Sequence, residues 1–139
     1  MERHEDLPLL TAVRSIILNK ENKVLLTKRA TGDFEAGKWC LPGGKPEENE
    51  DFIKAAKRET LEEIGVEIEL KYYKGQINPD TSTGAKWLTQ YFVGHLDEPP
   101  TQLQVEEVSE AIFFSQSELK ELDIAFDHKD VLIQFFSNL

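Results

Sequence analysis

Residues 43–66, GGKPEENEDFIKAAKRETLEEIGV, constrain the fold of this chain more than any other stretch. Residues 51–64 contain neither Pro nor Gly, and they predict one helix. Asn49 or Glu50 is expected near its N-cap, and Gly65 just past its C-terminus. The helix therefore follows a rigid double glycine and ends at a third glycine.

The rotation of about 100° per helical residue decides which side chains share a face. Ile53, Ala56, Thr60 and Ile64 fall on one stripe, with Leu61 beside it. We expect this stripe to face the core, because a half-buried helix turns one apolar stripe inward.

The acidic residues Glu59, Glu62 and Glu63 are expected on the other side of that helix. Like charges one turn apart destabilise a helix by about 0.2–0.5 kcal/mol per pair, and acids near a C-terminus oppose the helix dipole. This is either a solvated acidic face or a site for a cation. Carboxylate oxygens suit Mg²⁺ or Mn²⁺. One pair of unit charges 4 Å apart is worth about 4 kcal/mol at an effective dielectric near 20, so a divalent ion could outweigh the repulsion.

The remaining pattern predicts a sheet with a few helices. Strands are expected at residues 10–18, 24–29, 66–73, 87–96 and 108–114, with a short apolar segment at 39–41. Residues 19–23 should turn the first two strands into a hairpin. Ser115 or Ser117 could cap a short helix, and residues 127–139 predict a closing amphipathic helix. We expect one domain over residues 1–139, of the α+β class or a layered α/β/α sandwich.

The net charge of −10 disfavours a nucleic acid polymer or an anionic membrane as partner. No apolar run approaches the ~20 residues of a membrane span, and the charged N-terminus does not resemble a signal peptide. The one cysteine, Cys40, is interpreted as a small buried residue rather than a catalytic thiol. A cytoplasmic protein, monomer or homodimer, is expected.

Residues 43–66 resemble the Nudix box, the signature of nucleoside-diphosphate-X hydrolases. The family pattern is Gly, five residues, Glu, seven residues, then Arg-Glu-U-x-Glu-Glu-x-Gly-U, where U is aliphatic. Gly44, Glu50 and the run from Arg58 to Val66 match every fixed position. The one departure is Thr60 at the first U position, where we expect the methyl to pack and the hydroxyl to bond to the preceding turn.

The resemblance implies an α/β/α sandwich with a mixed central sheet, in which the box forms a loop, a helix and a loop. It also implies that Glu59, Glu62 and Glu63 hold Mg²⁺, with Mn²⁺ as the alternative ion, helped by the backbone carbonyl of Gly43. Glu50 and Arg58 would fix the loop against the helix.

The implied reaction is hydrolysis of a nucleoside diphosphate linked to another moiety. Glu62 or Glu63 could act as general base. So could a later carboxylate among Glu106, Glu107 and Glu110, of which Glu107 is the leading candidate for an additional base or metal ligand.

Four residues are candidates for binding a small nucleotide. Arg29 would meet the phosphates, while Trp39 would line a base pocket or belong to the core. Phe126 could stack on a base, and Asp127 could bond to its edge or cap the last helix, leaving His128 at the surface. The resemblance favours a MutT-like nucleoside triphosphate pyrophosphohydrolase that releases NMP and pyrophosphate. The alternatives are an ADP-ribose or nucleotide-sugar pyrophosphatase and a non-catalytic nucleotide-binding domain.

Overall fold

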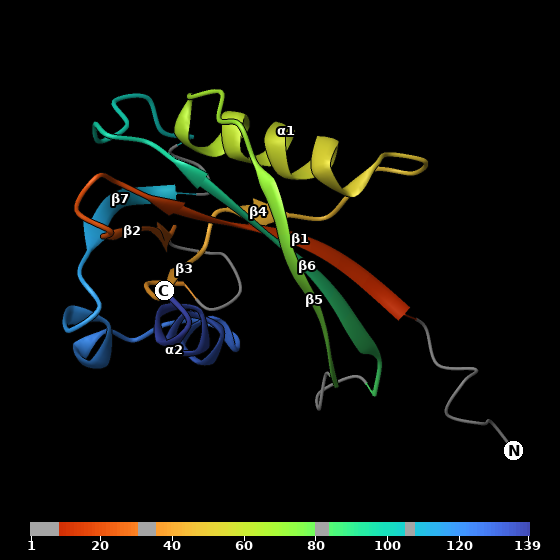
Figure 1. Ribbon diagram of the computed structural model, residues 1–139. Coiled ribbons are helices and arrows are strands. Elements are labelled where there is room, and N and C mark those ends of the chain that lie inside the picture. Colours follow the sequence, from red (N-terminus) through yellow and green to blue (C-terminus); the bar gives the residue numbers. More distant parts are fainter. Residues whose placement is uncertain (1–8, 31–35, 80–83, 105–107) are drawn as a thin grey trace, which may run out of the picture.

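The computed structural model describes residues 9–30, 36–79, 84–104 and 108–139 (Figure 1). A mixed sheet carries one helix on each face, so the predicted layered α+β architecture is confirmed. The strands are β1 (Leu9–Leu18), β2 (Val24–Arg29), β3 (Trp39–Cys40), β4 (Gly43–Gly44), β5 (Lys71–Pro79), β6 (Lys86–His95) and β7 (Val108–Phe114). The helices are α1 (Phe52–Ile64) and α2 (His128–Ser137), with a short 3-10 helix, η2 (Glu118–Glu121), before α2.

Strand β1 lies at the centre of the sheet, in the order β3-β2-β1-β6-β5. It runs parallel to β6 from Leu9 opposite Lys86 to Leu18 opposite His95. It meets β2 only at its far end, and β7 pairs with the other side of β2. The hairpin predicted between the first two strands is therefore confirmed, but its strands separate soon after the turn.

The short strand β4 pairs with β1 where β1 and β2 have separated, so that Gly43 lies opposite Arg14. The carbonyl of Pro42 accepts a hydrogen bond from Ser15 N at 2.9 Å. The sequence did not predict this strand, because two glycines in succession indicate a loop. The pairing is decided by β1, which offers its backbone groups to the incoming segment.

Two apolar cores fill the space between the sheet and the helices. Ile16, Tyr91 and Leu132 belong to the core under α2, and Val13 and Phe92 belong to the core under α1. Alternate residues of β1 point to opposite faces, which places Arg14 on the same side as Ile16 and therefore toward α2. No helix in the described ranges is long and apolar enough to cross a membrane.

Strand β5 begins later than the predicted strand at 66–73. Ile68 and Leu70 are buried in the core under α1, yet they lie in a segment without strand pairing. Their alternation reports burial, not membership of the sheet. The paired strand continues through residues 74–79, beyond the predicted end. It includes Pro79, which is tolerated because β5 is an edge strand.

The buried face of α1 is rotated relative to the predicted stripe. Ile53 and Leu61 are 38% and 47% exposed, whereas Ala55 and Glu63 are buried. The N-cap is Asp51, whose side chain makes no capping hydrogen bond, so the expected caps at Asn49 or Glu50 are wrong. This rotation brings the carboxylates of Glu59 and Glu63 against β4, where the two glycines have no side chains to exclude them.

The C-terminal glycine of α1 is confirmed: Gly65 adopts a left-handed conformation, with φ 72°. Thr60 is fully buried as expected, but its hydroxyl lies 3.2 Å from that of Ser15 in β1 and does not bond back to its own helix. This polar contact fixes α1 against the central strand.

We predict that Gly43→Ala unfolds far more readily than the wild type. A Cβ at Gly43 would lie 1.9 Å from the carbonyl oxygen of Val13, and its φ of +155° disfavours any side chain. The expected loss is at least about 3 kcal/mol, measured by urea denaturation. Gly37→Ala is the control, because φ there is +82° but the space is open, and it should cost only about 1 kcal/mol. Equal losses in the two variants would show that crowding at β4 is unimportant.

Candidate functional site

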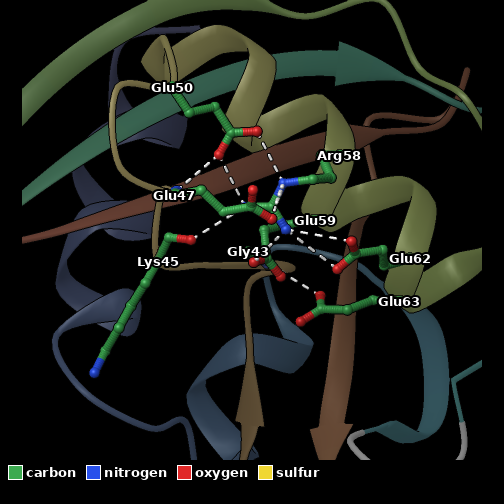
Figure 2. A network of polar contacts seen from close by, with 8 residues as sticks. All are labelled: Gly43, Lys45, Glu47, Glu50, Arg58, Glu59, Glu62 and Glu63. Carbon is green, nitrogen blue, oxygen red and sulfur yellow. Dashed lines mark hydrogen bonds and ion pairs between the residues drawn. The ribbon is translucent and has the colours of Figure 1, made fainter.

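Arg58, in the middle of α1, is the centre of a polar network that joins the helix to the loop before it (Figure 2). Its Nε and Nη2 donate to the two oxygens of Glu50 at 2.8 and 2.9 Å, a bidentate pair. Nη2 also donates to the backbone carbonyl of Lys45 at 3.2 Å. Glu50 itself accepts from Glu47 N at 2.9 Å. The predicted clamp between loop and helix is therefore present, and it is built around the loop backbone as well as around Glu50.

The same guanidinium contacts two of the three acids near the helix C-terminus. Nη1 of Arg58 lies 3.1 Å from Oε1 of Glu59 and 3.3 Å from both oxygens of Glu62. The hydrogen bonds to Glu50, followed by the contacts with Glu62 and Glu59, raise the pKa of Arg58 above its usual range. The repulsion that made this helix unfavourable by sequence is thus partly relieved within the helix itself.

Glu63 occupies a different position from the other two acids. It is buried, and its Oε2 accepts a hydrogen bond from Gly43 N at 3.0 Å (Figure 2). The expectation that all three acids lie opposite the core is therefore wrong for Glu63, which points at the glycine strand. Gly44 leaves room for Glu59 in the same way, since a Cβ there would lie 2.5 Å from the carboxyl carbon of Glu59.

The side chains near β4 offer the type of ligand atom that a hard cation prefers. Glu59, Glu62 and Glu63 supply only carboxylate oxygen, the ligand that Mg²⁺ and Mn²⁺ prefer. In the described ranges, however, no three acidic, His or Cys side chains converge closely enough to hold an ion. Arg58 Nη1 contacts oxygens of Glu59 and Glu62. A cation at this position would therefore compete with Arg58 for those oxygens.

A second group of charged side chains lies on the α2 side of β1. The guanidinium carbons of Arg14 and Arg29 lie 5.4 and 5.3 Å from the ring centroid of Phe126. Phe126 is 46% exposed and has a positive φ of 57°, which is rare for a large side chain. Arg29 and Phe126 were both candidates by sequence. Arg14 was missed, because one arginine within an apolar strand gives no signal of its neighbours.

Asp127 does not cap α2 with its side chain. Its Oδ2 accepts from Nε2 of Gln76 at 2.7 Å and also from the side-chain amide of Asn78, both on β5. Asp127 is therefore the N-cap residue of α2 by position, as expected, but its carboxylate faces the sheet and makes no capping hydrogen bond. Burial and the charge of Asp127 raise the pKa of Tyr91, which lies beside Arg14 on the neighbouring strand. Gln76 and Asn78 carried no recognisable motif.

His128 was expected at the surface and is instead 3% exposed. Its Nδ1 accepts a hydrogen bond from Leu41 N at 3.1 Å, which ties α2 to the segment before β4. Burial, followed by the positive charges of Arg14 and Arg29, holds the pKa of His128 well below its usual range. The imidazole is therefore neutral.

Two further expectations concern the segment around β3. Trp39 packs against the core under α2 and meets Phe114 edge to face, with ring centroids 4.9 Å apart. Cys40 is buried, as its interpretation as a small core residue requires.

Glu106 and Glu107, two of the later acids considered as an additional base or metal ligand, lie outside the described residues. Glu110 lies on β7, where its carboxylate is 3.6 Å from Lys28 Nζ.

Known proteins resemble this chain over most of its length. A family model described as the NUDIX domain matches residues 8–135. The chain is 36% identical over 91 residues to an RNA pyrophosphohydrolase of Pelagibacter ubique, a match covering 62% of this chain and 56% of that protein. It is 34% identical over 118 residues to an ADP-ribose pyrophosphatase of Methanocaldococcus jannaschii, covering 84% of this chain and 67% of that one. The chain thus spans little more than half of the first of these relatives.

Among solved structures, a MutT protein from Methanosarcina mazei Go1 has a TM-score of 0.81 to this chain. The match covers 96% of each chain at 23% sequence identity, and it shows the fold.

The clamp between Glu50 and Arg58 predicts a specific loss of stability in acid. Arg58, with help from Glu47 N, lowers the pKa of Glu50 from 4.5 to about 2. A carboxyl with a depressed pKa stabilises the fold above its unfolded pKa, and this contribution disappears as the pH falls toward 2. The free energy of unfolding should therefore fall less steeply between pH 5 and 2 in Glu50→Gln than in the wild type. Glu67→Gln, at an exposed position, should follow the wild type, and a parallel course for Glu50→Gln would contradict the clamp.

Proposed function

Because the chain belongs to the NUDIX family, whose model matches residues 8–135, we propose that it hydrolyses diphosphate bonds in small nucleotides with a divalent cation, Mg²⁺ or Mn²⁺. The observation that carries the proposal is the position of Glu63, a buried carboxylate held against Gly43 N beside Glu59 and Glu62. A bound cation would neutralise phosphate oxygens and lower the pKa of a water molecule there.

Some residues of the box would hold the cation, and others orient the residues that hold it. Glu59, Glu62 and Glu63 would hold the cation, and Arg58 keeps the first two in place through Nη1. Glu50 orients Arg58, so its effect on the reaction is indirect. Glu62, whose side chain is 48% exposed, is accessible to a water and can take its proton. Glu63 is the other candidate for that base, but one of its oxygens is already committed to Gly43 N.

The favoured substrate is a nucleoside triphosphate, which would be cleaved to NMP and pyrophosphate. Arg29 supports this choice, because it lies at the end of β2 with Arg14 near the same ring and adds positive charge for a chain of phosphates. ADP-ribose or a nucleotide sugar is the alternative. The extended match to the Methanocaldococcus jannaschii ADP-ribose pyrophosphatase favours it.

A substrate panel with Mg²⁺ distinguishes these choices. Nucleoside triphosphates, ADP-ribose, nucleotide sugars and an RNA with a 5′-triphosphate would be incubated with the protein, and the products separated by chromatography. We expect NMP and pyrophosphate from a triphosphate. Release of AMP and ribose phosphate from ADP-ribose alone would support the alternative. Binding without any product, with Mg²⁺ or Mn²⁺, would make this a non-catalytic nucleotide-binding domain.

The cation site makes a prediction that does not depend on turnover. Mg²⁺ at 100 times its dissociation constant should stabilise the fold by about 2.7 kcal/mol, seen as a higher Tm. Glu63→Gln should lose most of this gain, because it removes the carboxylate nearest to Gly43. Glu67→Gln changes the net charge equally at an exposed position and should keep the gain. An Mg²⁺ effect of the same size in both variants would mean that the ion binds elsewhere.

A further inference from the structure

His128 is the first residue of α2, and its buried ring is packed between two aromatic side chains. It meets the ring of Tyr91 edge to face, with centroids 6.5 Å apart, and it lies 5.2 Å from the ring of Phe126 at an interplanar angle of 51°. These neighbours leave the imidazole little freedom to turn. Its Nδ1 accepts a hydrogen bond from Leu41 N and therefore carries no proton.

Leu41 is fully buried, and both of its backbone polar groups bond to side chains of other elements. Its N–H donates to His128, and its carbonyl accepts from Nη1 of Arg14 at 2.9 Å. The strand ladders do not supply these bonds, since the pairing of β3 with β2 ends at Cys40 and that of β4 with β1 begins at Gly43. A buried backbone N–H without an acceptor is unfavourable, so the path of the chain at Leu41 depends on His128.

The two residues after Leu41 reach the acids of the box. The carbonyl of Pro42 accepts from the backbone of β1 at 2.9 Å, and Gly43 N donates to Oε2 of Glu63 at 3.0 Å (Figure 2). Only Pro42 separates the residue held by His128 from the residue that bonds to Glu63. A displacement of Leu41 would therefore move Gly43 as well.

We propose that His128 is a positioning residue of the proposed cation site, because its bond to Leu41 holds β4 where Gly43 meets Glu63. It acts through the backbone of residues 41–43 and needs no contact with the ion or the substrate. The inference rests on the proposed function for the identity of the ion. It gives α2, on the opposite face of the sheet from α1, a part in the geometry of the acidic site.

Asparagine and leucine at position 128 separate the hydrogen bond from the packing. Both side chains branch at Cγ and have nearly the same shape, but only Asn offers an acceptor, Oδ1, close to the place of the imidazole Nδ1. His128→Asn should therefore keep the bond to Leu41, whereas His128→Leu leaves that N–H buried without an acceptor. Val131→Ala, which removes two methyl groups from the buried face of α2, is the control for lost stability alone.

Mg²⁺ binding is the first measurement, followed as the increase in Tm with ion concentration. His128→Leu should weaken binding about tenfold, the lower end of what changes behind the metal ligands cause. His128→Asn and Val131→Ala should bind Mg²⁺ as the wild type does, even where their Tm without the ion is lower. If His128→Leu binds as tightly as the wild type, or if either other variant loses as much affinity, the positioning role is wrong and the proposed function stands.

Hydrogen exchange of the Gly43 amide tests the positioning without any ion. Exchange should be about tenfold faster in His128→Leu than in His128→Asn or Val131→Ala, because a displaced glycine no longer keeps its bond to Glu63. If Mg²⁺ does not stabilise the wild type but this difference is seen, the proposed cation site is wrong and the positioning of β4 by His128 stands. Equal exchange in the three variants would overturn the positioning, whatever the effect of Mg²⁺.

Discussion

The interaction on which the candidate site depends is the contact of one guanidinium with four carboxylates, those of Glu47, Glu50, Glu59 and Glu62. Arg58 makes a bidentate pair with Glu50 and also reaches Glu59 and Glu62 one turn away. Without it, the acids of α1 would repel each other and the loop before the helix would lose its anchor. An exposed ion pair is worth little, but this one joins several charges and a backbone carbonyl, so it fixes geometry more than it adds stability.

The double glycine of β4 gives the acids of α1 room to approach the sheet. Gly43 and Gly44 enter the sheet where β1 leaves β2, and their lack of side chains admits Glu63 and Glu59 from one direction. Arg14 approaches from the other. In a chain of net charge −10, the acids of α1 and Arg14 therefore lie on opposite sides of the backbone of Gly43.

Sequence reasoning succeeded where a local rule decides the outcome. The resemblance to the Nudix box implied the pairing of Glu50 with Arg58, and Gly65 ended α1 in the left-handed conformation that glycine adopts easily. It failed where the partner is distant in the chain. His128 is buried and accepts a hydrogen bond from the segment before β4. Asp127 is at the N-terminus of α2, but its side chain bonds to two amides of β5 and not to its own helix.

The sequence by itself determined the helix, its flanking glycines and the presence of an acidic box, because these follow from residues within one or two turns of each other. Only the tertiary structure decided the rotation of α1, which buries Glu63 and exposes Leu61. It alone brought Arg14 to Phe126, since residues more than a hundred positions apart meet only when strands pair and a helix packs across them. The motif that indicates the family is therefore local in the sequence. Which charged groups lie close together is decided by long-range packing.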